Sequence, residues 1–474
     1  MNMGCASFRR LMSRRRFFEV GGAGMFGLAW SDFFRAQAKA SGGSDAPGKA
    51  KSPGKAKQVI FIFLRGGPPQ QDMFDMKPDQ PEEVRGPFKP IQSKVPGLDV
   101  CEHLPRLSRV ADKFTILRSV NAKGYPQAGD HFGGSNWKTG NPRGILGTPK
   151  YPTYGNVTSK LLPTPQGLPS FVVMGALDSM SPGVRENYLG PAYNHLDISL
   201  PGDPQKGGAS DGKSGGSFVD LTRLNINESD LQRNAELLRA LEEQLRQQDK
   251  QDALLTTLDR FQQKAFDMLR SPKLRDALDL DKESDKTREL YGYSITDEFT
   301  RKGYAGNYHC PRILAARRLI EAGVPFVYLD FGYWDWHNGR SVATALPHFH
   351  QFDAAMSSLL EDLDQRGLLD TTMVVALGEM GRTPKASRPI YGREHWAAAQ
   401  FVFVAGGGWR RGAVVGATDA QAAYVKNKEY KVGSLGKTIY HLLGIDPEHE
   451  LYTTDNRPMK IITEDVPLIK EAIA

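Results

Sequence analysis

The chain has 474 residues, 40% of them hydrophobic, and carries a formal net charge of +7. A chain of this length and composition can bury a large core, as one α/β domain or as two ordinary domains. Residues 1–40 hold seven Lys and Arg against two Asp and Glu, which places about +5 of the net charge in this segment. The remainder is close to neutral, which argues against nucleic acid as the partner.

The N-terminal 40 residues have the pattern of an export signal. SRRRFF at 13–18 is followed by an apolar run at 20–30 and by small residues at 36–40. Paired arginines are typical of a twin-arginine (Tat) signal, and the apolar run is too short to span a bilayer comfortably. We therefore expect export by the Tat machinery to the periplasm or the exterior. Tethering to the membrane by an uncleaved signal is the alternative.

Two further segments are set apart by composition. Residues 41–58 are rich in Gly, Pro and Lys and predict a disordered linker, so the folded domain is expected at 59–474. Residues 201–216 match the phosphate-loop pattern formally, but they lack the strand before and the helix after that such a loop needs. We interpret them as a flexible surface loop.

Residues 225–278 have leucines at helical spacing and predict an inserted helical hairpin. Its expected role is packing against the domain. A lid or a contact between copies in a homo-oligomer is the alternative.

The folded region alternates short apolar runs with longer mixed segments. Continuous apolar runs predict strands covered on both faces, hence a mostly parallel sheet between helices. The predicted strands begin near residues 59, 114, 170, 324, 371 and 401, and two predicted helices, 310–323 and 346–367, end at a glycine that can cap them. One disulfide between Cys101 and Cys310 is feasible, but nothing in their spacing demands it.

Polar side chains gather just after the predicted strands or just before one. Asp335 and His337 follow one strand, Glu379 follows the next, and His395 precedes the last. In open α/β sheets ligands bind outside the carboxyl ends of the strands, so these segments could converge. Carboxylate and imidazole together suit a divalent ion such as Zn²⁺, Mn²⁺ or Mg²⁺. For each residue alone, a hydrogen-bonded structural role is the alternative.

Two arginines accompany this predicted metal site. Arg382 and Arg393 suit an anionic substrate, because a guanidinium can bind phosphate or sulfate oxygens through two hydrogen bonds. The alternative is that they form salt bridges with Glu379 or Glu394.

At these residues the sequence resembles a known family. It is similar to the exported proteins grouped as domain of unknown function 1501, which are sulfatase-like members of the alkaline phosphatase superfamily. The matching stretches cover nearly the whole folded chain in order: GGPPQQDMFDMKPDQPEEVRGPF (66–88), EHLPRLSRVADKFTILRSV (102–120), ARRLIEAGVPFVYLDFGYWDWH (316–337), GEMGRTP (378–384), GREHW (392–396), GATD (416–419) and TIYHLLGID (438–446).

The resemblance implies an alkaline-phosphatase-like three-layer α/β/α sandwich with a mostly parallel central sheet and a helical insertion. It also implies hydrolysis or transfer of phosphate or sulfate esters at one or two divalent metals, among which Zn, Mn, Mg and Ca remain open. Asp335, His337, Glu379 and His395 match the superfamily's late ligands.

The early positions depart from the superfamily pattern. Arg65 stands where a ligating Asp is expected, and Pro69 replaces the Ser usual in the family's turn. Arg65 could meet an anion instead. Asp72 could supply the missing metal-binding carboxylate, as could Asp75, although a role in fixing the turn is an equal alternative.

The superfamily nucleophile is also replaced. Counting back from Thr139-Gly140, its position falls on Asp130, next to His131. His131 could ligate metal or act as acid and base, and Asp130 could ligate metal, while Ser119 and Ser135 are the nearest hydroxyls. The motif C-x-P-S-R of formylglycine sulfatases does not occur, which disfavours standard sulfatase chemistry.

The sequence thus predicts an exported metal-dependent hydrolase of phosphate or sulfate esters, acting on a small molecule or a glycan. Asp130, His131 and Arg382 are its candidate catalytic residues, and Arg65 and Arg393 are expected to contact the substrate. The alternative is a non-catalytic protein of the same fold that binds anionic or sulfated glycans. A third reading is a surface-scaffold protein that uses the 225–278 helices.

Overall fold

The computed structural model describes residues 54–142, 150–177, 184–200, 203, 267–268, 271–295, 309–337, 345–453 and 456–474. The expected signal at 1–40, the loop at 201–216 apart from residue 203, and nearly all of the helical insertion before residue 271 lie outside these ranges. Within them, none of the helices combines the length and the apolar character that crossing a membrane requires.

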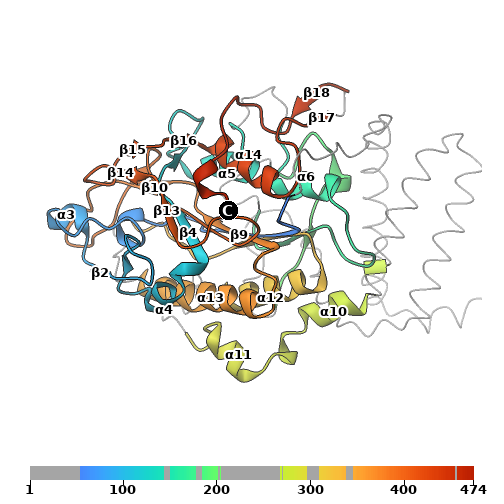
Figure 1. Ribbon diagram of the computed structural model, residues 1–474, viewed down its shortest axis with the longest axis horizontal. Helices are drawn as coiled ribbons and strands as arrows, with labels where there is room; N and C mark the ends of the chain where they lie inside the picture. The colour runs from blue at the N-terminus through green and yellow to red at the C-terminus, as the bar shows by residue number, and fades with distance from the viewer. Residues whose placement is uncertain are drawn as a thin grey trace, which may run out of the picture.

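An eight-stranded sheet runs through the centre of the domain, in the order β13-β4-β12-β9-β1-β8-β6-β7 (Figure 1). Strand β12 is antiparallel to both of its neighbours, and every other neighbouring pair is parallel. This confirms the mostly parallel sheet expected from the continuous apolar runs. The strands are β1 (Gln58–Phe63), β4 (Phe114–Leu117), β6 (Phe171–Met174), β7 (Leu196–Asp197), β8 (Phe326–Asp330), β9 (Thr372–Leu377), β12 (Val402–Ala405) and β13 (Ala413–Val415).

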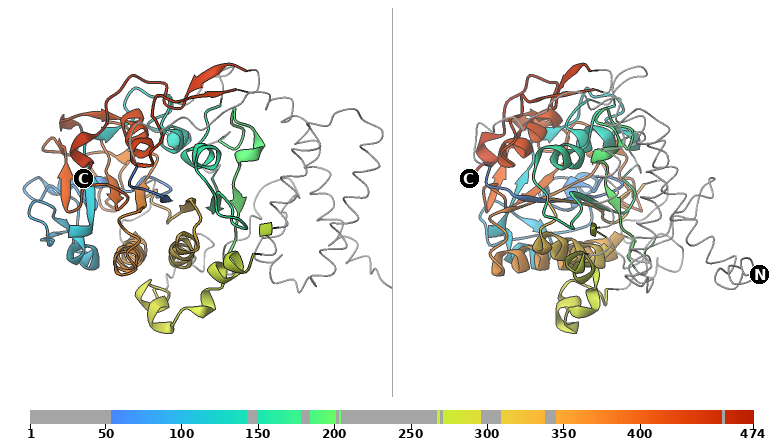
Figure 2. Two further views of the ribbon diagram at one scale, coloured as in Figure 1. Left: turned by 45° about the vertical axis from the view of Figure 1, so that its right-hand side comes forward. Right: turned by 90° about the vertical axis from the view of Figure 1, so that its right-hand side faces the viewer.

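Helices cover both faces of this sheet. Helices α12 (His309–Ala322) and α13 (Leu346–Gln365) lie on one face, and α5 (Gly134–Thr139), α6 (Tyr154–Leu161) and α14 (Val432–Leu442) lie on the other. Figure 2 shows the layers from the side, with α13 (orange) and α14 (red) on opposite sides of the sheet. The domain is therefore the expected three-layer α/β/α sandwich. Gly323 and Gly367, predicted to cap α12 and α13, have φ of 111° and 67°, as C-capping glycines do.

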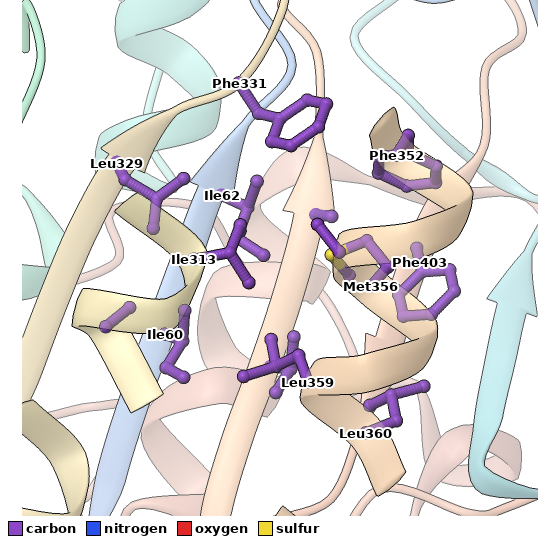
Figure 3. Close-up of a cluster of buried hydrophobic side chains, with 14 of the residues drawn as sticks. Ile60, Ile62, Ile313, Leu329, Phe331, Phe352, Met356, Leu359, Leu360 and Phe403 are labelled. Carbon is purple, nitrogen blue, oxygen red and sulfur yellow. The ribbon is translucent and has the colours of Figure 1, made fainter. Parts of the chain in front are cut away.

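The central strand β1 shows why the chain forms three layers. Its side chains alternate between faces. Ile60 and Ile62 pack in the core cluster that contains Ile313 of α12 and Met356 of α13 (Figure 3). The alternate residues of β1, Val59, Phe61 and Phe63, pack in the other cluster with residues of α6 and α14. Since both faces are buried, the strand needs a continuous apolar run.

Short elements surround this core. They include the helices α3 (Glu82–Arg85), α4 (Pro105–Arg109), α10 (Pro272–Leu278) and α11 (Asp285–Leu290) and five two-stranded sheets. These sheets pair β2 (Pro90–Ile91) with β3 (Val100–Cys101), β5 (Val120–Asn121) with β16 (Tyr430–Lys431), β10 (Gly381–Arg382) with β11 (His395–Trp396), β14 (Ala417–Thr418) with β15 (Val425–Asn427), and β17 (Glu450–Tyr452) with β18 (Pro458–Lys460).

One boundary from the sequence analysis is corrected here, and the open question of a disulfide is answered. The linker was expected to reach residue 58, yet Ala56 is buried and its N–H donates to Leu442 O at 3.0 Å. The ordered domain therefore begins before Val59. Cys101 and Cys310 are both buried and unpaired, so no disulfide joins them. Burial raises the pKa of the Cys101 thiol to about 12, which leaves it protonated at neutral pH.

The two-sided burial of β1 can be tested at Ile62. Its side chain is fully buried between the sheet and the helices α12 and α13. Ile62→Ala should lower the free energy of unfolding by about 2–5 kcal/mol, because it leaves a cavity in a rigid layer. Tyr452→Ala, at a side chain that is 44% exposed, is the control and should change it by about 0.5 kcal/mol or less. Equal denaturation midpoints for both variants would contradict this packing.

Candidate metal centre

The candidate site lies where the central strands end. Strand β8 ends at Asp330 beside Phe63, the last residue of β1, and β9 ends at Leu377 on the other side of Phe63. The segments carrying Asp335 and Glu379 therefore leave the sheet at one edge. His395 precedes β12 rather than following it, but β12 is antiparallel, so its beginning lies at the same edge. Chain direction thus brings all of these segments together.

Four of the candidate residues form one cluster. His131, Asp335, His337 and His395 each offer a donor atom, and these atoms all lie within 4.8 Å of one another. The Asp335 carboxylate is at their centre. Its Oδ1 is 2.9 Å from His337 Nε2 and 3.3 Å from His395 Nε2, and its Oδ2 is 3.5 Å from His131 Nε2. Metal–donor bonds of about 2.0–2.2 Å place tetrahedral donors about 3.4 Å apart. The three separations from Asp335 are close to this value and the four donor atoms lie within 4.8 Å of one another, so these residues could hold a divalent ion.

Carboxylates behind two of the imidazoles orient them toward the centre. His131 Nδ1 lies 2.8 Å from Glu379 Oε1, and His337 Nδ1 lies 3.0 Å from Glu394 Oε2. A carboxylate can only accept, so the Nδ1 of His131 carries the proton and its Nε2 is left as the ligand, whereas His337 Nδ1 is within ion-pair distance of Glu394 without forming a hydrogen bond. Metal-binding histidines are typically held in this way by an outer carboxylate. The donor set and its support therefore fit a divalent ion such as Zn²⁺.

The charges of His131 and Asp335 stabilise each other and shift both pKa values. Burial by itself would lower the pKa of His131, but hydrogen bonds to Asp335 and Glu379 and the charges of both outweigh it and raise that pKa to about 9. Burial would raise the pKa of Asp335, whereas His131, His395 and Arg382 together hold it far below its usual range. Asp335 is thus ionised at neutral pH. A bound cation would take the place of the proton on His131 Nε2.

Glu379 stands behind the cluster instead of within it. The Gly66 N–H donates to both of its carboxylate oxygens, at 2.9 and 3.0 Å, and the side chain is fully buried. The expectation that Glu379 is itself a ligand is therefore replaced by a role in orienting His131. Of the two roles expected for His131, metal ligation agrees with its place in the donor set.

Arg382 binds the Asp335 carboxylate directly. Its Nη2 donates to Asp335 Oδ1 at 2.7 Å, its Nε to Gly67 O at 2.8 Å and its Nη1 to Arg393 O at 3.0 Å. The side chain is only 1% exposed. Arg382 therefore fixes a carboxylate of the cluster, and its donors do not point toward a substrate as expected.

Asp72 and Arg393 form a separate buried pair. Arg393 Nε and Nη2 donate to the two oxygens of Asp72, each at 3.0 Å, and both side chains are 2% exposed. The structure therefore does not place Asp72 with the metal ligands, and Arg393 is not open to substrate. The alternative that Asp72 fixes the turn agrees with this arrangement, although the carboxylate partner of Arg393 was expected to be Glu379 or Glu394.

The remaining candidates lie around the cluster. Asp130 accepts from the N–H of Phe132 and so caps the short helix His131–Gly133. Arg65 is half-buried and its guanidinium lies over the Tyr333 ring at 5.4 Å. Ser135 and Ser119 donate to the backbone carbonyls of Phe132 and Val415, both at 3.4 Å. Both serine hydroxyls therefore bind backbone carbonyls.

Sequence reasoning missed the structural use of the glutamines in the GGPPQQD turn. Gln70 is buried, accepts from the Arg382 N–H at 3.0 Å and donates to Arg382 O at 3.1 Å. Gln71 also donates to Arg382 O, at 3.1 Å. The available signal in the sequence was the pair of consecutive glutamines shortly after a predicted strand. Their amides are buried in the structure, and a buried amide must find hydrogen-bond partners.

These observations define the class of protein: an α/β/α domain with a histidine-rich candidate metal centre at the carboxyl ends of its central strands. The chain belongs to the family described as "Protein of unknown function (DUF1501)", whose model matches residues 56–473. No curated protein matches the sequence.

Several solved structures are distantly similar. The alkaline phosphatase from the Antarctic bacterium TAB5 is 10% identical with a TM-score of 0.36, over 82% of this chain and 99% of that one. The PsFucS1 sulfatase from Pseudoalteromonas sp. is 12% identical with a TM-score of 0.34, over 88% and 72%. The lipoteichoic acid synthase LtaP from Listeria monocytogenes is 10% identical with a TM-score of 0.33, over 88% and 78%. At these scores the likeness carries no weight in assigning an activity.

Metal binding is the direct test of the donor set. The purified chain should hold about one divalent ion after supplementation, since the four residues form a single donor cluster. His395→Ala and His337→Ala should each lower the metal content measured by mass spectrometry. His350→Ala is the matched control, because His350 is exposed and contacts His103 outside the cluster. An unchanged metal content in the two cluster variants would refute the assigned ligands.

The supporting role of Glu379 has its own test. Glu379→Gln keeps the shape of the side chain but removes the charge that holds the Nδ1 proton of His131. Metal affinity should fall about 10- to 100-fold, as when an outer carboxylate is removed, with the metal content restored at high metal concentration. Titration with Zn²⁺ against a chelator measures this. If Glu379 were a ligand of equal standing, the variant would lose the ion as completely as His395→Ala.

Proposed function

We propose that the protein is an exported metal-dependent hydrolase that acts on phosphate or sulfate esters. The observation that carries the proposal is the convergence of three imidazole Nε2 atoms on Asp335, with carboxylates behind two of the rings. A divalent ion bound there would supply Lewis-acid chemistry, polarising the ester and lowering the pKa of a water molecule.

The chain's own residues would supply position and charge. Arg382 holds the Asp335 carboxylate in place, and Glu379 fixes the Nδ1 proton of His131. The site is half-buried, since the side chains of His131 and His395 are 22% and 23% exposed. An ester can therefore reach the cluster from solvent, while the Glu379 carboxylate behind His131 is fully buried.

Water is favoured over a side-chain nucleophile. Ser135 and Ser119, the hydroxyls nearest the expected position in sequence, donate to backbone carbonyls. The hydroxyl found beside the cluster belongs to Tyr333, which donates to Asp335 Oδ2 at 3.3 Å. We therefore propose direct hydrolysis and not a covalent enzyme intermediate. In this proposal His131 stays in the donor set, with its Nδ1 proton held by Glu379.

A second candidate function is binding without catalysis. It is favoured by Arg382 and Arg393, which are both buried and bonded to protein groups instead of facing an anion. In this reading the metal cluster captures an anionic or sulfated glycan. Export by a twin-arginine signal, a periplasmic or secreted location with membrane tethering as the alternative, and self-association through the 225–278 helices also remain proposals that rest on the sequence.

Turnover of aryl esters separates the two functions. The metal-loaded protein should hydrolyse p-nitrophenyl phosphate or p-nitrophenyl sulfate, and Asp335→Asn should lower kcat/KM by about 100-fold or more, since the charge at the centre of the cluster is lost. His350→Ala should behave as wild type. Stoichiometric metal with no turnover of either ester would overturn the hydrolase and support the binding function.

A further inference from the structure

A second feature is linked to the metal centre through Trp396, the residue after His395: an exposed aromatic ring with a lysine over it. The Tyr424 side chain is 46% exposed and meets the Trp396 ring edge-on, with centroids 5.6 Å apart at 69°. Lys123 Nζ lies 5.3 Å from the centroid of the Tyr424 ring. We call Lys123, Trp396 and Tyr424 the aromatic platform.

Backbone contacts hold the platform in place. The Trp396 indole N–H donates to Ala423 O at 2.6 Å, and the Asp419 side chain accepts from the Ala423 N–H at 2.8 Å. Gln70, which fixes Arg382, also donates to Ala422 O at 3.1 Å. The platform is thus tied to the same buried turn as the metal centre. A ring that is exposed and yet fixed loses little conformational entropy when a ligand covers it.

The platform and the metal centre are continuous along two segments. Trp396 directly follows His395 in β11. Lys123 begins the loop that leads to His131, and the Ala122 N–H donates to Ala397 O at 3.3 Å, which fixes this loop beside Trp396. Most residues between Lys123 and His131 are exposed. A ligand could therefore lie across this loop and reach both sites.

Three lysines, Lys123, Lys426 and Lys431, lie around the platform, together with the carboxylates of Asp419 and Glu429. Neither Lys123 nor Lys426, two residues after Tyr424, forms an ion pair with any residue that the structure describes, and both are exposed. Lys431 Nζ donates to Lys123 O at 3.2 Å and lies 3.4 Å from Glu429. Ammonium groups around an exposed aromatic face suit a ligand with an apolar face and anionic substituents.

We propose that the aromatic platform is a subsite for a sulfated polysaccharide, with a pyranose ring on Tyr424 and its sulfate at Lys123. The apolar C–H face of a pyranose packs on an aromatic ring, and an equatorial sulfate that projects beyond the edge of the sugar would draw the Lys123 ammonium from its place over the Tyr424 ring. The platform binds the sugar unit next to the one whose ester reaches the metal centre. This inference rests on the proposed function, because it names the substrate class of that same site.

A single platform also distinguishes this ligand from single-stranded nucleic acid. Nucleic-acid grooves place several aromatic rings along a continuous basic track. Here one exposed ring is flanked by a few lysines, and the chain beyond residue 40 is close to neutral. The chemistry therefore favours a polyanion whose charge is borne on sugar rings.

Binding can be measured without catalysis. Isothermal titration of the full-length, metal-loaded protein with dextran sulfate oligosaccharides should show saturable binding, and unsulfated dextran should bind much more weakly. Tyr424→Ala should weaken binding about tenfold, in line with the loss of an aromatic contact, and Tyr424→Trp should restore it. Lys123→Gln should weaken binding about threefold and reduce its dependence on salt. Tyr452→Ala, at a tyrosine of similar exposure, is the control.

The outcomes separate this inference from the proposed hydrolase. If wild-type protein binds the oligosaccharide but cleaves no ester, the hydrolase fails and the subsite stands. If Tyr424→Ala binds as tightly as wild type, the subsite is overturned whatever the protein hydrolyses. Tighter binding of a deoxythymidine oligomer than of dextran sulfate, lost in Tyr424→Ala, would overturn the sugar in favour of nucleic acid. Equal binding of dextran and dextran sulfate would overturn the role of sulfate.

Discussion

The candidate site depends on the ionised carboxylate of Asp335. A buried carboxylate is costly unless cations and donors surround it, and here Arg382, His337 and His395 meet Oδ1 while His131 lies beside Oδ2. These partners come from the segment after β8, from the β10–β11 hairpin and from the turn before α5. Satisfying one charge therefore fixes three parts of the chain relative to one another, and a bound cation would use the same geometry.

The turn after β1 holds other residues of the site in place. Gly66 has φ of 102°, and a Cβ there would lie 2.5 Å from Asp335 N, so only glycine lets the two backbones approach this closely. The Gly66 N–H then binds Glu379, and Gln70 and Gln71 bind the backbone of Arg382. A turn that could have carried a ligand or a nucleophile instead supports residues brought by later strands.

Part of the site was accessible to sequence reasoning because it depends on local order. Asp335, His337 and His395 could be proposed as ligands since polar residues beside strand ends gather at one edge of an α/β sheet. Asp72, predicted as a ligand, and Arg393, predicted to contact the substrate, could not be assigned in this way. A carboxylate and a guanidinium can each serve a site or join in a buried ion pair, and only the 3.0 Å contacts between them show which applies here. Glu379 was likewise predicted near the cluster, but only its contacts with His131 Nδ1 and the Gly66 N–H show that it orients His131.

The sequence by itself determined the layers of the fold, because continuous apolar strands must be covered on both faces and amphipathic helices provide that cover. It also determined which residue types could carry chemistry. Tertiary structure decided the rest: that β12 runs antiparallel and so delivers His395 to the site, that Arg382 is occupied by Asp335, and that Tyr424 stands beside Lys123. Such pairings join residues far apart in the chain, and they depend on where whole elements pack, which no local pattern encodes.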